Sequence, residues 1–201
     1  MNRIAVVFVL ITSSYLSYAQ TSKGSFILGG DASLSFRKNE NPGYSTTKSN
    51  SFSLNPSVGY FVRNNFAAGL TFPIAAAHFN TNYNSGASAS ESSASSYALG
   101  PFIRYYIPVG KIFILAEGSY TWARSKSKYQ QVDNTTGSLT DVTSTYNDEN
   151  YRVATGMAIF LGENAGIDIL LNYQKFNFDS LTSSSLFLSV GFKVYIPSKK
   201  N

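Results

Sequence analysis

The segment Tyr97–Trp122 alternates apolar residues with small or polar ones on both sides of the turn Pro108–Lys111. A period of two over runs this long predicts β-strands, and the short turn between them predicts a hairpin. One face of this hairpin is almost entirely apolar and ends in aromatic residues, whereas the other is small, polar or charged. The pattern is typical of two strands with lipid on one side and a polar interior on the other.

The same alternation recurs along the chain and predicts eight strands, at residues 26–37, 51–62, 66–76, 97–107, 112–122, 151–160, 167–174 and 186–196. Long polar connections alternate with tight turns, and the parity of each short turn keeps the apolar faces on one side. This asymmetry is typical of outer-membrane barrels, in which both termini lie on the turn side. The first and eighth strands should pair, because no backbone edge may face hydrocarbon. The sequence therefore predicts an all-β fold, an eight-stranded antiparallel up-and-down transmembrane β-barrel.

Three prolines interrupt this pattern. Pro56, Pro73 and Pro101 lie within predicted strands, where proline removes a ladder hydrogen bond. We expect β-bulges, or gaps between ladder bonds, at these positions.

The N-terminus has the features of an export signal. Met1–Arg3 is a short positive start, Ile4–Ile11 is an apolar core, and Ser17–Ala19 supplies the small-x-small cleavage pattern. The apolar run is too short for a spanning helix, which needs about 20 residues. We therefore expect a signal peptide at residues 1–19 and an outer-membrane β-barrel domain at residues 20–201.

The amino-acid composition argues against several kinds of binding site. Charged residues make up 13% of the 201 residues, the formal net charge is +5, and the basic residues are scattered. This argues against nucleic-acid binding. Without cysteine there is neither a disulfide framework nor a thiolate metal site, and the single histidine, His78, makes a transition-metal site improbable. We expect no cofactor and no metal.

Aromatic residues of the apolar face gather near both strand ends, as two girdles at the headgroup level would require. Towards the long connections we assign Phe36, Phe52, Tyr97, Trp122, Tyr151 and Tyr173; towards the tight turns we assign Phe26, Tyr60, Phe66 and Tyr105.

Charged residues on the opposite parity should point into the lumen. They are Asp31, Arg104, Glu117, Asp168 and Lys193, joined nearer the long connections by Arg37 and Arg152. An even turn around Val109-Gly110 would place Arg104 opposite Leu115 and diagonal to Glu117. These charges form either a selectivity ring or an ion-pair network that fills the lumen. We favour the network, because eight strands leave a width that side chains fill.

Three segments carry a resemblance to a known family: Pro56–Val62 before a tight turn, Gly100–Tyr106, and the ending Ser189–Ile196. Over residues 24–196 the chain resembles the small outer-membrane β-barrel proteins, the OmpA/OmpX-like, porin-like group of Gram-negative bacteria. In the ending, Ser189, Gly191, Val194 and Ile196 resemble the signal that the barrel-assembly machinery reads. The chain departs from that signal because Pro197–Asn201 follow it.

The resemblance implies a cell-envelope protein of the bacterial outer membrane with both termini in the periplasm. Its expected partners are outer-membrane lipid and lipopolysaccharide and the assembly machinery, with no nucleic acid, and the barrel is expected to be a monomer. We expect a structural or surface-interaction role, with a surface ligand bound through loops 39–50, 80–95 and 126–150. A narrow porin-like diffusion channel is the alternative.

Two other readings are weaker. A lipid-modifying enzyme would need His78, Glu91 and a serine at the rim, but a triad is established by geometry rather than by composition. A soluble, lipocalin-like barrel would require a charged outer face, and the non-apolar parity consists mostly of Ser, Gly, Ala and Asn. We therefore expect no enzymatic activity.

Overall fold

The structure, a computed structural model, describes residues 20–83, 90–110, 112–132, 139–178 and 181–198. Its strands are β1 (Phe26–Asn41), β2 (Ser45–Arg63), β3 (Phe66–Thr71), β4 (Ile74–Tyr83), β5 (Ser90–Val109), β6 (Ile112–Val132), β7 (Leu139–Phe160), β8 (Ala165–Phe178) and β9 (Leu181–Ile196). Within these ranges no helix is long and apolar enough to cross a membrane. The expected signal peptide, residues 1–19, lies outside the described residues.

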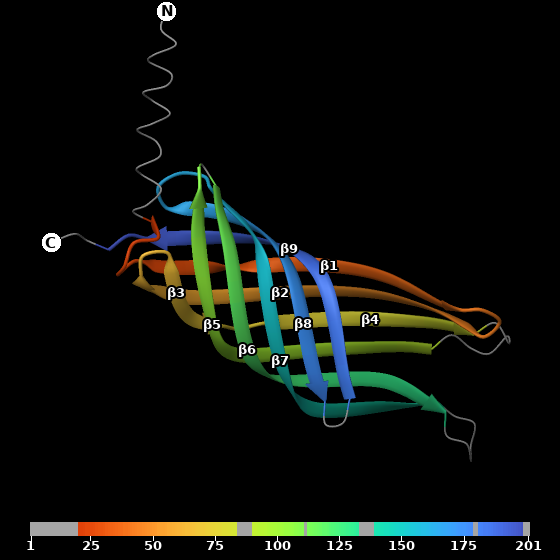
Figure 1. Cartoon of the computed structure of the whole chain (residues 1–201). Coiled ribbons are helices and arrows are strands. Elements are labelled where there is room, and N and C mark those ends of the chain that lie inside the picture. The colour runs from red at the N-terminus through yellow and green to blue at the C-terminus, as the bar shows by residue number, and fades with distance from the viewer. Residues whose placement is uncertain (1–19, 84–89, 111, 133–138, 179–180, 199–201) are drawn as a thin grey trace, which may run out of the picture.

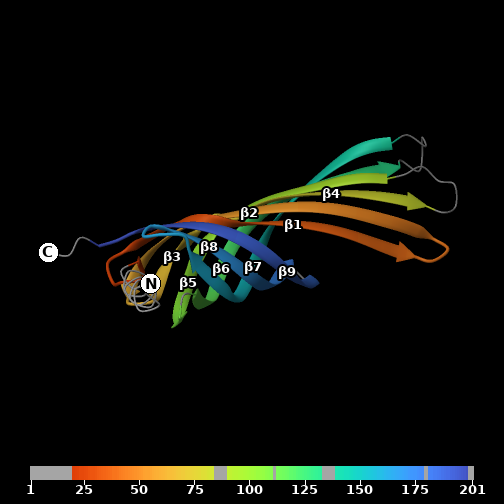
Figure 2. The same ribbon diagram turned by 90° about the horizontal axis from the view of Figure 1, so that it is seen from above.

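All strand pairs are antiparallel, and β1 pairs with β9, so the sheet closes on itself. Both ends of the described chain, Gln20 and Ser198, lie on the side of the tight turns, and three long hairpins project on the other side (Figures 1 and 2). The predicted all-β, up-and-down antiparallel topology is confirmed, and the expected pairing of the first and last strands is correct. Closure leaves no backbone edge exposed to lipid.

The ring has eight strand positions because β3 and β4 occupy one of them. Residues Thr71 and Ile74 continue the same register against β2 and against β5. Between them Pro73 has no N–H to donate, although its carbonyl oxygen accepts a bond of 2.8 Å from the Ala98 amide. The third expected strand is therefore split by a gap in the ladder, without a shift in register.

The turn between β2 and β3 explains how the parity of the two strands is kept. The register shifts between Phe61 and Arg63, and Asn65 adopts a positive φ of 64°. A tight turn that ends in a left-handed residue and a bulge behaves as a three-residue loop. It therefore matches the odd loop that the sequence requires.

The three long connections expected as loops are mostly strand, which corrects the sequence prediction. Residues 39–41 and 45–50 belong to the β1–β2 hairpin, and β7 alone has 22 residues, whereas a span needs about 9–11. The turn of that first hairpin is only residues 42–44. Hydroxyl pairs such as Thr47–Thr81, at 3.0 Å, join neighbouring strands. These strand ends face water on both sides, so they lack the apolar alternation that marks the membrane part.

Candidate functional site

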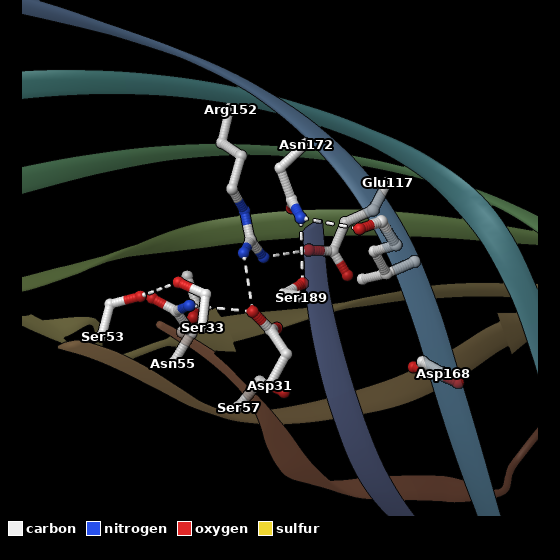
Figure 3. Close-up of polar contacts among 12 residues, drawn as sticks. Asp31, Ser33, Ser53, Asn55, Ser57, Glu117, Arg152, Asp168, Asn172 and Ser189 are labelled. Carbon is white, nitrogen blue, oxygen red and sulfur yellow. Dashed lines mark hydrogen bonds and ion pairs between the residues drawn. The ribbon is translucent and has the colours of Figure 1, made fainter. Parts of the chain in front are cut away.

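Charged side chains from five strands converge in the lumen of the barrel. They are Asp31 of β1, Arg104 of β5, Glu117 of β6, Arg152 of β7 and Asp168 of β8. All five residues are buried, with at most 9% of their surface exposed. Figure 3 shows Arg152 reaching from β7 towards Asp31 and Glu117. We call these five residues the lumen network.

The lumen network is a continuous chain of ion pairs. The Asp168 carboxylate lies 2.6 Å from one Arg104 amino group, and Glu117 Oε2 accepts from Arg104 Nε at 2.7 Å. The other Glu117 oxygen accepts from Arg152, which also pairs with Asp31 at 3.0 Å. Because β5 and β8, like β7 and β1, are not neighbours in the sheet, these pairs cross the lumen from wall to wall.

One part of this arrangement differs from the sequence prediction. Arg104 lies directly opposite Glu117, and Leu115 lies opposite Tyr106. The prediction of a diagonal Arg104–Glu117 pair was wrong because the turn follows Val109, which pairs with Ile112. The inward parity does not change, since the register moves by two residues.

Uncharged polar residues form hydrogen bonds with two of the buried charged groups in the lumen. Asn55 Nδ2 donates to Asp31 at 2.8 Å. Lys193, which is fully buried, donates to Ser57 Oγ at 3.1 Å rather than joining the ion-pair chain. With Lys193, three buried cations stand against the three carboxylates of the lumen network. This balance favours burial, because an unpaired buried charge is strongly destabilising.

An aromatic layer fills the lumen on the turn side of the network. Phe61, Tyr106, Phe113, Phe160 and Tyr195 lie with ring centroids 4.9–6.4 Å apart. Tyr106 joins the two levels, because its hydroxyl accepts from Arg104 at 3.1 Å and lies 3.1 Å from the Tyr195 hydroxyl. The lumen is therefore occupied by packed rings as well as by charges.

The chain before β1 covers the turn-side end of the barrel. Gln20 and Thr21 are buried, Gln20 Nε2 donates to the Gly162 carbonyl oxygen, and Thr21 Oγ1 donates to Asn65 Oδ1 at 2.6 Å. These contacts tie the start of the described chain to two of the tight turns.

On the other side of the network lies a chamber that is lined mostly by small side chains. The chamber has a volume of about 140 Å³, and its lining includes Ser51, Ala77, Ser125, Asp148 and Asn150. Ser125 donates to Asp148 at 2.5 Å. The small residues leave open space at this end of the lumen, whereas the aromatic layer fills the lumen at the turn-side end.

Arg37, also expected in the lumen, takes no part in the network. It lies in β1 beyond the girdle and is exposed, and no ion pair of the described residues includes it. The adjacent Lys38 pairs with Glu40. This neighbour lowers the pKa of the Glu40 carboxyl, by a hydrogen bond and by its charge.

Nine of the ten expected girdle residues are exposed and Phe66 is half-buried. The exposed nine are Phe26, Phe36, Phe52, Tyr60, Tyr97, Tyr105, Trp122, Tyr151 and Tyr173. The four residues of the expected assembly signal lie in β9: Ser189 and Gly191 are buried, whereas Val194 and Ile196 are exposed.

His78 lies on the outer face of β4, opposite Ser93 of β5. Both residues line a shallow depression of about 270 Å³ with Glu91 and Asp141. In the described part of the chain, His78 forms no hydrogen bond with Ser93 or Glu91, and Glu91 accepts a long bond of 3.4 Å from Asn80. No group of three or more His, Asp or Glu residues there is placed to hold a metal ion.

Sequence reasoning missed the contributions of Asn55, Tyr106 and Tyr195. Their inward parity was visible, as was their position near the turn-side half of each strand. The sequence does not show which residues on distant strands these three side chains contact, because those contacts form only when the barrel closes.

Comparisons with known proteins agree with this geometry. Residues 4–193 match the family model described as the outer membrane protein beta-barrel domain. No curated protein matches the sequence.

Among solved structures, the fold is similar to that of the outer membrane protein OprG from Pseudomonas aeruginosa, with a TM-score of 0.58 and 11% identity. That match covers 90% of this chain and 99% of OprG. Neisserial surface protein A is also similar, with a TM-score of 0.50 and 18% identity over 86% of this chain and 99% of that protein. At these identities the likeness shows the fold.

Proposed function

Because the chain belongs to the outer membrane protein beta-barrel domain family, we propose that it is an integral outer-membrane protein with a closed lumen that acts structurally or in interactions at the cell surface. The observation that carries this proposal is the lumen network, whose ion pairs join strands on opposite walls. The aromatic layer beside it supports the same conclusion. In this proposal they close the lumen at the level of Arg104 and Tyr106.

Conductance of the refolded protein in planar bilayers tests the closed lumen. We expect no stable unit conductance. A stable and reproducible unit conductance would contradict the closed lumen and favour the narrow diffusion channel. The chamber next to Asp148 would then be its outer vestibule.

The three long hairpins support a surface-interaction role. They carry exposed tyrosines, including Tyr44 at 66% and Tyr146 at 37% exposure, and the rings of Tyr44 and Tyr83 pack edge to face at 6.3 Å. Tyrosine provides a large, rigid contact area at low entropic cost. In this proposal the hairpins, not flexible loops, present the surface to an external ligand, and both termini lie in the periplasm.

We assign no catalytic role to the outer face. A nucleophile and its base should lie within hydrogen-bond reach of each other, and in the described chain His78 and Ser93 do not bond. The resemblance of the β9 ending to an assembly signal suggests that the assembly machinery inserts the barrel.

A further inference from the structure

A wide depression on the outer face lies where the strands bend, near the girdle on the long-hairpin side. Its volume is about 970 Å³, and residues of β4, β5, β6, β7 and β8 line it, together with Phe72 and Pro73 between β3 and β4. We call it the bend groove. β5, β6 and β7 curve strongly along their length (Figure 1).

Local sequence explains the bend. Pro73 interrupts the ladder beside the groove, and the β5–β6 pairing skips Gly100 and Pro101. A Cβ atom at Gly100 would lie 1.9 Å from the Tyr120 carbonyl oxygen, so the two backbones approach closely at a position that only glycine allows. Proline and glycine at such positions mark bends in a sheet. The groove therefore forms where proline and glycine bend the strands.

The lining of the groove combines apolar, aromatic and charged residues. Phe72, Ile74 and Leu99 form the apolar part, with 41%, 53% and 47% of their surfaces exposed. Tyr97 lies opposite Ile74 and Trp122 lies opposite Leu99, and amphipathic rings of this kind prefer the headgroup level of a membrane. Apolar and interfacial side chains therefore lie side by side in one depression, as a lipid with an acyl chain and a headgroup requires.

Two opposite charges lie beside these rings, with Arg124 opposite Tyr97 and Glu149 opposite Trp122. Arg124 and Glu149 both line the groove and are exposed. Arg124 lies opposite Asn147, two residues from Glu149 on the same face, so the pair are diagonal neighbours, about 7–8 Å apart. Neither joins an ion pair in the described part of the chain.

We infer that the bend groove binds a zwitterionic phospholipid, with its phosphate on Arg124, its ammonium group on Glu149 and an acyl chain along Phe72, Ile74 and Leu99. Guanidinium groups bind phosphate through several donors in a fixed geometry. A carboxylate beside it supplies the complementary site for an ammonium group. Two carbons separate phosphate from ammonium in such a headgroup, and both side chains are long enough to reach its two ends.

Native mass spectrometry of the refolded protein in maltoside micelles tests this inference. The probes are dioleoyl phosphatidylethanolamine, dioleoyl phosphatidylglycerol, dioleoylglycerol and lipid A, each added at the same concentration. We expect one phosphatidylethanolamine to be retained at least tenfold better than phosphatidylglycerol or dioleoylglycerol. Equal retention of phosphatidylglycerol, or stronger retention of lipid A, would overturn the assignment of a zwitterionic headgroup.

Variants separate the two contacts. Arg124→Gln should reduce phosphatidylethanolamine retention at least tenfold, and Glu149→Gln should remove the preference over phosphatidylglycerol. Ile74→Trp fills the groove while keeping the lipid face apolar, and should also reduce retention. The control is Lys128→Gln, an exposed cation on the same face of β6, about 13 Å further along the strand, which should leave retention unchanged. If Arg124→Gln behaves like Lys128→Gln, the groove does not hold the phosphate.

Discussion

Arg104 is the residue on which the lumen network depends most, and its replacement gives the sharpest test of the closed lumen. Asp168 has its only ion pair in the network with Arg104, and its other oxygen, Oδ1, is buried without a hydrogen-bond partner in the structure. Glu117, in contrast, keeps Arg152 when Arg104 is lost. Arg104→Met keeps most of the volume of the side-chain stem and removes the charge. The dominant cost should therefore be the isolated Asp168 carboxylate.

Breaking a buried pair by removing one partner costs about 3–5 kcal/mol, so Arg104→Met should lower the free energy of unfolding by about that amount. The double variant Arg104→Met/Asp168→Asn no longer buries an unpaired charge. It should therefore lose less than the sum of the two single changes, by about 0.5–3 kcal/mol.

Urea unfolding of the protein in lipid vesicles measures these differences, with the single tryptophan, Trp122, as the fluorescent reporter. The control is Glu40→Gln, which removes a carboxylate from an exposed ion pair with Lys38 and should leave the unfolding midpoint unchanged. Strict additivity of Arg104→Met and Asp168→Asn would refute the coupling. So would an Arg104→Met midpoint equal to that of the control.

Three further outcomes follow from the placement of the faces. The folded protein should migrate faster on unheated than on boiled gels, and identical mobility would contradict a stable barrel. In intact cells a Tyr44→Cys variant should react with an impermeant thiol reagent, whereas Glu163→Cys, in the turn before β8, should not; labelling of both would contradict the proposed orientation. Leu171→Arg on the lipid face should cost about 2–4 kcal/mol near the midplane, whereas Gln174→Arg, on the lumen parity, should cost less; equal refolding stabilities would show that the faces are misassigned.

The sequence by itself determined which face each residue of the membrane part occupies. Leu170 is fully buried and Leu171 is 43% exposed, as their parities predict. The physical reason is local: successive side chains of a strand point to opposite sides, so one apolar stripe in lipid fixes the face of every neighbour. The same pattern, together with the alternation of tight turns and long connections, was sufficient to predict a ring with eight strand positions.

The lengths of the hairpins could not be predicted in the same way. Segments such as residues 39–50 are polar on both parities, because both faces of the sheet lie in water there. Hydropathy then gives no alternation, and serine and threonine runs look like loops. Their strand structure comes from pairing with a neighbour, as the Thr47–Thr81 bond illustrates.

The register and the contacts across the lumen were decided only by the tertiary structure. An even turn fixes parity but permits a slide of two residues, so Arg104 could face Leu115 or Glu117 without moving a lipid-facing residue into the lumen. Likewise, no local rule links Arg104 of β5 to Asp168 of β8, or Lys193 of β9 to Ser57 of β2. Closure of the sheet brings these strands within reach, and burial then requires that their charges and hydrogen-bonding groups find partners.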